Sequence, residues 1–225
     1  MEERSVFSAA HRFIIADDHP LFRGALRQAV EKFFKNVQIF EVGTLEDVCH
    51  TLDLEEDIDL IFLDLSMPGM RGFSGLMFLR AQYTGVPIVV VSGNEDPAVV
   101  RSAMEFGASG YIPKSLGVNF IEEAVNSILE GGIWVPSHID LTSDSNEAKM
   151  AQRMASLTPQ QVRVLMMLSQ GLLNKQIAYE LSVSEATVKA HVSAILQKLA
   201  VESRTQAVIA AARLEAGQLA ELVTG

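Results

Sequence analysis

The sequence predicts an α/β domain, built as a five-stranded doubly wound parallel sheet, followed by a smaller all-helical domain. Within residues 11–130, five short apolar runs alternate with five stretches of helical periodicity. Repeated strand, helix, strand units of this kind form a parallel sheet with helices on both faces. Residues 1–150 contain 11 Lys and Arg against 23 Asp and Glu, a net −12, whereas residues 151–225 contain 7 against 5, a net +2. This contrast indicates two domains with different partners.

The expected strands are short and apolar, as strands buried on both faces of a parallel sheet usually are. They lie at residues 13–16, 37–42, 60–64, 88–91 and 110–112. Residues that favour helix starts follow three of the strands, namely Pro20, Thr44 and the pair Asp96 and Pro97. The expected helices span residues 20–34, 44–52, 74–81, 96–106 and 119–130.

The carboxyl ends of the five strands should meet at one edge of the sheet, where open α/β sheets bind their ligands. The sequence places Asp17, Asp18, Asp64, Ser92 and Lys114 at this edge. Clustered carboxylates repel one another, and a hard divalent cation such as Mg²⁺ relieves that repulsion. Lys114 and Ser92 supply a charge and a hydroxyl suited to phosphoryl oxygens. Taken alone, Asp64 fits equally well as a residue that caps the loop after its strand.

This constellation resembles the receiver domain of two-component response regulators, over about residues 11–130. The resemblance rests on an acidic pair after the first strand, Asp64 after the third, Ser92 after the fourth, and Tyr111 and Lys114 on and after the fifth. It implies a flavodoxin-like fold, Mg²⁺ as the cofactor and a sensor histidine kinase as the partner that donates the phosphoryl group.

Residue by residue, the resemblance implies that Asp64 is the phosphoacceptor. Asp18 would ligate Mg²⁺ directly and Asp17 would act through a water molecule. The main-chain carbonyl of Ser66 would complete the protein ligands, together with Asp64 itself.

The same resemblance gives roles to the side chains around the phosphoryl group. Lys114 would neutralise the acyl phosphate, and the Ser92 hydroxyl would bind one of its oxygens. Tyr111 occupies the switch position, whose ring follows Ser92 inward on activation. The alternative for Tyr111 is an ordinary amphipathic strand residue.

Residues 131–156 break the alternating pattern. Two glycines, a proline and a cluster of Ser, Asp and Asn predict a linker, although Ile133, Trp134 and Val135 should pack on a domain surface. The expected domains are therefore residues 11–130, this linker, and a helical domain at residues 157–225.

The helical domain begins with Thr158, Pro159 and Gln161, which give an N-cap, a first-turn proline and a capping-box partner. A short helix capped by Asn174 follows, and after a turn at residues 182–184 comes a longer helix. Helix, tight turn, helix is typical of the helix-turn-helix. A packed helical hairpin without a binding function would show the same pattern.

Four segments closely resemble, in order, the LuxR-type helix-turn-helix of the NarL/FixJ regulators: LTPQQVRVL, GLLNKQIAYEL, SEATVKAHVSAILQKL and SRTQAV. The resemblance implies binding to double-stranded DNA, with some side chains at base edges and others at phosphates. The residues facing bases would be Lys189, Ala190 and Ser193, and the candidates for phosphate contacts are Asn174, Lys175, Thr187, His191 and Lys198.

Four residues depart from the pattern of that family. Gln161 and Arg163 stand where the family usually has glutamates, Ala194 where it often has Asn, and Ala200 where it has Gly. These departures bear on the details of half-site recognition and not on the fold.

The sequence thus predicts a phosphorylation-regulated transcription regulator that binds DNA as a homodimer when active. It is not expected to be an enzyme, apart from self-phosphorylation and autodephosphorylation at Asp64. Residues 204–216 should be helical, and the small side chains of Ala207, Ala211 and Ala212 would form a dimer seam or else close the domain core.

Two other functions remain as alternatives. One is a receiver-type interaction protein whose helical domain does not bind DNA. The other is a phosphohydrolase with Asp64 as nucleophile, which would need a general acid beside it. No apolar run approaches the roughly 18 residues of a membrane span, and the N-terminus does not resemble a signal peptide, so a cytoplasmic protein is expected. The single cysteine, Cys49, excludes an internal disulfide.

Overall fold

The structure is a computed structural model that describes residues 11–68, 70, 72–141 and 146–216. Its first domain is built on a five-stranded sheet in the order β2-β1-β3-β4-β5, in which every neighbouring pair is parallel. The strands are β1 (His11–Ala16), β2 (Val37–Val42), β3 (Leu60–Leu63), β4 (Ile88–Ser92) and β5 (Gly110–Pro113). The strand order reverses between β1 and β3, which is the point where doubly wound sheets bind ligands.

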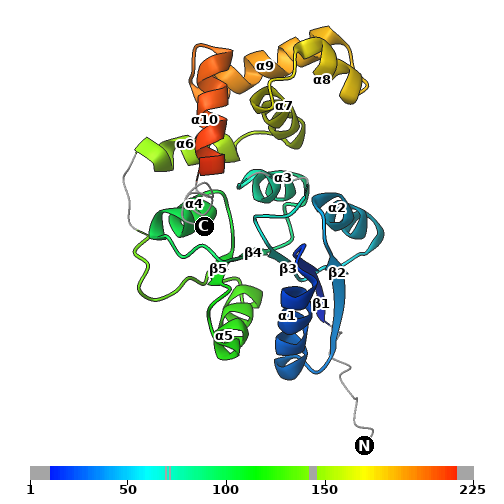
Figure 1. Cartoon of the computed structure of the whole chain (residues 1–225), viewed down its shortest axis with the longest axis vertical. Helices are drawn as coiled ribbons and strands as arrows, with labels where there is room; N and C mark the ends of the chain where they lie inside the picture. Colours follow the sequence, from blue (N-terminus) through cyan, green and yellow to red (C-terminus); the bar gives the residue numbers. More distant parts are fainter. Residues whose placement is uncertain (1–10, 69, 71, 142–145, 217–225) are drawn as a thin grey trace, which may run out of the picture.

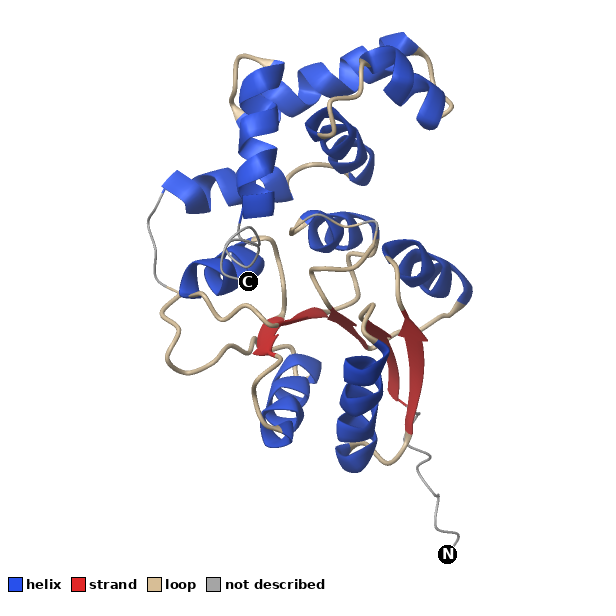
Figure 2. Ribbon diagram, viewed as in Figure 1, coloured by secondary structure: helices blue, strands red, loops and turns tan. Residues whose placement is uncertain are grey.

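Helices cover both faces of this sheet, shown in red in Figure 2. One face carries two helices, α1 (Pro20–Phe33) and α5 (Val118–Leu129). The other face carries three, α2 (Leu45–Leu54), α3 (Ser74–Gln82) and α4 (Pro97–Glu105). Alternate residues of a strand point to opposite faces of the sheet. Phe62 therefore packs in the core on the side of α1 and α5, and its neighbour Leu63 packs in the core on the side of α2, α3 and α4.

Strand pairing brings the ends of β1 and β3 together. Ala16 is in register with Leu63 on one side and with Val42 on the other, so the residues that follow Ala16 and Leu63 leave the sheet side by side. β3 and β4 are buried along their whole length, as their continuous apolar sequences predict.

The outer edge of β5 is covered by the chain that follows α5. Trp134 forms a parallel bridge with Gly110: its N–H donates to the Ser109 carbonyl at 3.1 Å, and the Tyr111 N–H donates to the Trp134 carbonyl at 2.9 Å. The Trp134 indole Nε1 also donates to Glu123 Oε1 at 3.1 Å. A Cβ at Gly110 would lie 2.9 Å from the Trp134 carbonyl oxygen, so this close approach requires glycine.

The helices that follow α5 in the chain pack through α7 and α9 (Figure 1). They are α6 (Asn146–Ala155), α7 (Pro159–Ser169), α8 (Asn174–Glu180), α9 (Glu185–Leu199) and α10 (Arg204–Ala216). The Ser184 side chain caps the start of α9, and Ala200, directly after its last residue, adopts the left-handed conformation at φ 52°. None of the helices that the structure describes has the length and apolar character needed to cross a membrane.

The predicted fold class is confirmed, and each strand and helix of the first domain lies within two residues of its expected bounds. Two local features differ from expectation. The segment predicted as a linker contains α6, on which Ala151 and Met154, three residues apart, are both buried. Asn174 is the first residue of α8, and Leu173 takes the N-cap position instead.

The position of α10 decides between the two interpretations of its alanines. Ala207 and Ala211 are buried inside the helical domain, at 0% and 1% exposure, and α10 packs against α7 and α9. The prediction that they form a dimer seam is therefore wrong, because their surface is already used by the domain core. Ala212 is exposed, as are Thr205 and Ile209 on the same side of the helix.

Candidate functional site

Two buried carboxylates lie at the centre of the site. Asp17 follows β1 and Asp64 follows β3, and the Asp64 N–H donates to the Ala16 carbonyl at 2.9 Å. Each of these aspartates is only 2% exposed. Asp18 lies beside them, and His19 joins the group, with its Nδ1 3.2 Å from Asp17 Oδ1 and 2.9 Å from Asp18 Oδ1.

Lys114 reaches this cluster from the loop after β5. Its Nζ lies 2.7 Å from Asp17 Oδ2 and 3.1 Å from Asp64 Oδ2. Burial lowers the pKa of Lys114, but its contacts with Asp17 and Asp64 outweigh burial and the net shift is upward. Burial raises the pKa of Asp64, opposed by the charge of Lys114 and reinforced by that of Asp17. The site therefore holds an aspartate that is costly to keep ionised and a lysine placed to compensate it.

The acidic cluster has the composition of a cation site. Single ligand atoms from Asp17, Asp18, His19 and Asp64 all lie within 4.8 Å of one another. Three of the buried carboxylate oxygens, Asp17 Oδ2, Asp18 Oδ1 and Asp64 Oδ2, accept no hydrogen bond of normal geometry, although a nitrogen of Lys114 or His19 lies close to each. Buried oxygens in this state match the needs of a hard divalent cation.

Ser92 and Tyr111 lie on the neighbouring strands of the same edge. Ser92 is buried, and its Oγ accepts from the Asn94 N–H at 3.2 Å, so its own O–H can still donate. Its carbonyl accepts from the Lys114 N–H at 2.7 Å, which ties the end of β4 to the lysine. Tyr111 is wholly buried and its O–H donates to the Asn94 carbonyl at 2.6 Å. The ring is thus held in the protein interior by the loop that follows β4.

Two participants were missed in the sequence analysis. His19 was not identified as a site residue, although a potential ligand directly after Asp17 and Asp18 is a visible signal. Asn94 was not expected to hold both Ser92 and Tyr111, because it does so through its backbone, which no side-chain pattern reports. Ser66 lies exposed in the loop after Asp64, and its backbone amide contacts the Asp64 carboxyl group.

The second candidate site is the outer side of α9. Lys189, Ala190 and Ser193 are exposed there, opposite Val188 and Ile195, which are buried in the domain core. Lys189 Nζ lies 3.1 Å from Glu185 Oε1, one turn earlier, and both side chains are largely exposed. An exposed pair of this kind contributes little stability, so Lys189 can exchange that carboxylate for another anion or a base edge.

The five candidates for phosphate contacts are not equally accessible. Lys175 and Thr187 are exposed, and His191 is half-buried. Asn174 Oδ1 accepts from Arg204 Nη1 at 3.2 Å, and Lys198 Nζ donates to the Ser156 carbonyl at 2.6 Å and to Gln161 Oε1 at 2.9 Å. Lys198 therefore joins α9 to the start of α7, and it is the candidate least available to DNA.

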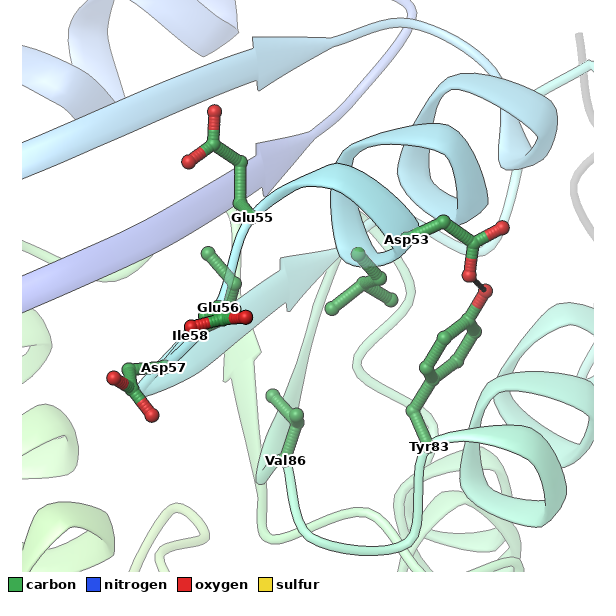
Figure 3. Close-up of a pocket in the computed structure, with 8 residues that line it drawn as sticks. Asp53, Glu55, Glu56, Asp57, Ile58, Tyr83 and Val86 are labelled. Carbon is green, nitrogen blue, oxygen red and sulfur yellow. Dashed lines mark hydrogen bonds between the residues drawn. The ribbon is translucent and has the colours of Figure 1, made fainter.

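A separate hollow of about 390 Å³ lies at the opposite end of the sheet, where the chain enters β3 and β4 (Figure 3). It is lined in part by Asp53, Glu55 and Asp57, and the Tyr83 O–H donates to Asp53 Oδ1 at 2.8 Å. None of the predicted site residues lines it. The hollow is therefore separate from the acidic cluster that follows β1 and β3.

Comparison with known families gives a match for each domain. Residues 13–126 match the response regulator receiver domain, and residues 155–211 match the luxR family of bacterial regulatory proteins. The first match contains the acidic cluster, Lys114 and Tyr111. The second contains α7 to α9 with all the candidate DNA contacts.

Individual proteins resemble the chain over nearly its whole length. A glycerol metabolism activator of Pseudomonas putida is 39% identical over 213 residues, which cover 91% of this chain and 96% of that protein. The nitrate/nitrite response regulator protein NarP of Escherichia coli strain K12 is 34% identical over 200 residues, which cover 87% of this chain and 92% of NarP. The fold is shared with RcsB from Salmonella enterica serovar Typhimurium, whose structure was solved bound to a promoter in the presence of phosphomimetic BeF₃⁻. The TM-score is 0.54 and the identity 22%, and the match covers 89% of this chain and 97% of the RcsB chain.

Proposed function

This chain belongs to the two-component response regulators, which regulate transcription through a receiver domain and a LuxR-type DNA-binding domain, and we propose that phosphorylation of Asp64 controls its binding to promoters. The observation that carries this proposal is the environment of Asp64. Its carboxylate is buried at the carboxyl edge of the sheet, beside Lys114 and a second buried carboxylate. Few structural aspartates require such an arrangement, whereas a phosphoacceptor does.

The chemistry follows from the groups present. A carboxylate oxygen of Asp64 attacks the phosphorus of the donor, a new O–P bond forms, and the bond from phosphorus to the donor's leaving group breaks with its electron pair. Lys114 balances the negative charge that builds up on the phosphoryl oxygens, and the Ser92 O–H donates to one of them. Phosphoryl transfer depends on positioning and charge balance more than on a general base, which suits this set of side chains.

The residues at the edge also fit Mg²⁺, the cofactor expected from the resemblance. Asp17, Asp18 and Asp64 would hold the ion, with the Ser66 carbonyl as a further ligand, and the buried oxygens without normal hydrogen bonds support this assignment. When bound, the ion supplies positive charge to the phosphoryl oxygens. Asp17 also forms an ion pair with Lys114, which holds the lysine at the site.

The partners proposed for the two domains differ in kind. A sensor histidine kinase would donate the phosphoryl group in the cytoplasm, and double-stranded DNA would bind the outer side of α9. One recognition helix buries little surface, and helix-turn-helix proteins gain affinity by binding two half-sites as dimers. The exposed side of α10, with Thr205, Ile209 and Ala212, is the part of that helix still available for a second copy. We place the domains at residues 11–130 and 157–225, joined by residues 131–156.

Replacing Asp64 by Asn tests the phosphoacceptor, because Asn keeps the shape and loses the nucleophile. Asp57→Asn is the matched control, since Asp57 is exposed at the other end of β3 and its φ of 58° suits Asn. Radiolabelled acetyl phosphate with Mg²⁺ should label the parent chain and the control but not Asp64→Asn, and EDTA should prevent labelling. Undiminished labelling of Asp64→Asn would show that another residue accepts the phosphoryl group.

A second experiment tests the DNA interface. Lys189→Ala should weaken operator binding by about 1 to 3 kcal/mol, with the loss concentrated at one base pair of each half-site. Lys175→Ala should weaken binding to all sequences alike and reduce the salt dependence by about one counterion. Gel shifts across a set of operator variants measure both. If neither change alters DNA binding, the helical domain serves another role, as in the interaction-protein alternative.

A further inference from the structure

The ammonium group of Lys114 contacts an aromatic ring as well as the carboxylates of the site. Its Nζ lies 4.6 Å from the centre of the ring of Phe22, which belongs to the first turn of α1. Phe22 is half-buried and packs against the core between the sheet and helices α1 and α5. The neighbouring Leu21 is 92% exposed and lies in solvent instead. An ammonium group over a ring is attracted by the negative charge of the π electrons.

Hydrogen bonds fix the first turn of α1 against the end of β1, which carries Asp17. The His19 N–H donates to Asp17 Oδ1 at 2.7 Å, and Arg23 Nη1 donates to the Asp17 carbonyl at 2.5 Å. Arg23 Nε also donates to Glu41 Oε2 of β2 at 3.3 Å. These bonds hold the turn that carries Phe22 in a defined position relative to the carboxylates.

Two ion pairs, with Asp17 and Asp64, also hold the Lys114 ammonium at the site, and both depend on the charge of a carboxylate. The same carboxylates are among the ligands proposed for Mg²⁺. A bound divalent cation weakens the pull of the carboxylates on the ammonium and repels it directly, because charges of like sign lie close together in a partly buried site. The Lys114 side chain is flexible and 20% exposed, so it can turn outward into water.

The Phe22 ring differs from the carboxylates in this respect. It carries no net charge and is not a ligand of a hard cation, so it attracts the ammonium whether or not Mg²⁺ is bound. Phosphoryl transfer needs the ion and the lysine together, because both compensate the negative charge of the phosphoryl oxygens. A contact that does not depend on the charge of the carboxylates serves this need.

We propose that Phe22 is a positioning residue for phosphoryl transfer, whose ring keeps the Lys114 ammonium beside Asp64 when Mg²⁺ is bound to the carboxylates. The proposal rests on the proposed phosphorylation of Asp64. Phe22 acts through Lys114 and not on the phosphoryl group itself. The alternative role of Phe22 is packing between α1 and the core, and the two roles lead to different experimental results.

Removal of the ring has two linked consequences. With Mg²⁺ bound, a larger fraction of Lys114 turns outward, which slows labelling at Asp64 and also relieves the repulsion between the lysine and the ion. Without Mg²⁺, Asp17 and Asp64 still hold the lysine inward. The affinity for Mg²⁺ should therefore rise by the same factor by which labelling at saturating Mg²⁺ falls, because both report the same displaced fraction. At low Mg²⁺ the two changes cancel, and the labelling rate should equal that of the parent chain.

Phe22→Leu removes the ring and keeps an apolar side chain. We expect labelling by acetyl phosphate at saturating Mg²⁺ to fall about two- to fivefold, as for one partly exposed cation–π contact. The dissociation constant for Mg²⁺, measured by isothermal titration calorimetry on the full chain without a phosphodonor, should fall by the same factor. A trifluorinated phenylalanine in place of Phe22 keeps the shape of the ring and reduces its π charge, so it should reproduce both changes. Phe22→Tyr should restore the parent values, and the matched control Leu21→Ala should leave them unchanged.

Loss of both Mg²⁺ affinity and labelling in Phe22→Leu would show that the ring serves packing alone, and it would overturn the proposal. Parent values in the trifluorinated chain, or an equal change in Leu21→Ala, would also overturn it. If the parent chain is labelled at Asp64 but Phe22→Leu changes neither value, the positioning role fails and the proposed function stands. If the parent chain is not labelled at Asp64, the proposed function fails, and the calorimetric values still decide whether the ring controls Lys114.

Discussion

The contact between Gln161 and Lys198 allows a quantitative prediction, because a single change converts a hydrogen bond from an ammonium group to a neutral amide into an ion pair. Gln161 is 7% exposed, and its Oε1 accepts from Lys198 Nζ at 2.9 Å and from the Thr158 N–H at 3.0 Å. Gln161→Glu keeps the length and the acceptor oxygen of the side chain. It places a negative charge next to the ammonium and in the first turn of α7, where the helix dipole favours anions.

The expected gain is modest because two effects oppose each other. The parent hydrogen bond already has a charged donor, so the gain comes from the added attraction between opposite charges, about 0.2 to 1 kcal/mol, and from the helix dipole, which adds about 0.3 to 1. Removing water from the new carboxylate offsets part of this gain. We expect Gln161→Glu to raise the free energy of unfolding of the helical domain by about 1 kcal/mol at neutral pH.

The pH dependence has a definite sign. The carboxyl group introduced by Gln161→Glu should have a folded-state pKa below its unfolded value of about 4.3, so its contribution is complete above that pH and disappears as the pH falls through the folded pKa. Urea unfolding of the full chain, followed by circular dichroism at about pH 7 and again below about pH 4, measures the difference. Lys198→Met, alone and combined with Gln161→Glu, completes a double-mutant cycle. A gain that persists at low pH, or that survives without Lys198, would refute the ion-pair argument.

Two further predictions concern glycine and alanine positions. Gly110→Ala should cost about 1 to 3 kcal/mol in thermal or urea unfolding, because its Cβ would lie 2.9 Å from both the Trp134 carbonyl oxygen and Ile128 Cδ1. The control Gly85→Ala meets no atom within 4 Å and should change stability by less than about 0.5 kcal/mol. Ala211→Glu should unfold the helical domain, as seen by loss of helical circular dichroism, because it buries a charge in the core. The exposed neighbour Ala212→Glu should stay folded, and the reverse pattern would restore the dimer-seam interpretation of Ala211.

The receiver could be predicted closely because its signals are local in sequence. A continuous apolar run such as residues 60–63, ended by Asp64, specifies both a buried strand and the place where it stops. Parallel pairing then brings Asp17, Asp64 and Lys114 to one edge without further information, since strand ends align in a parallel sheet. The part that escaped prediction depends on backbone groups, such as the Asn94 amide and carbonyl that hold Ser92 and Tyr111.

The helical domain was harder to predict because the same residue types occur both in its core and on its surface. Alanine is compatible with both, so the sequence could not tell that Ala211 is buried while Ala212 is exposed. The resemblance makes Lys198 a candidate for a phosphate contact, and the sequence could not reveal its hydrogen bond to Gln161, which lies 37 residues away in the chain. The docking of Arg163 on Phe78 joins two domains, and no pattern within either domain specifies it.

The bridge between Trp134 and Gly110 has a consequence for anyone who studies the receiver alone. An exposed strand edge with unpaired N–H and carbonyl groups is a template for pairing with another chain, and proteins avoid leaving such edges open. A fragment that stops at residue 130, where α5 has ended, would remove Trp134 and leave the Ser109 carbonyl and the Tyr111 N–H without their partners. Such a fragment should associate through β5 and aggregate on concentration, whereas one that continues through Val135 keeps the edge closed. The smallest well-behaved receiver is therefore longer than its last helix suggests.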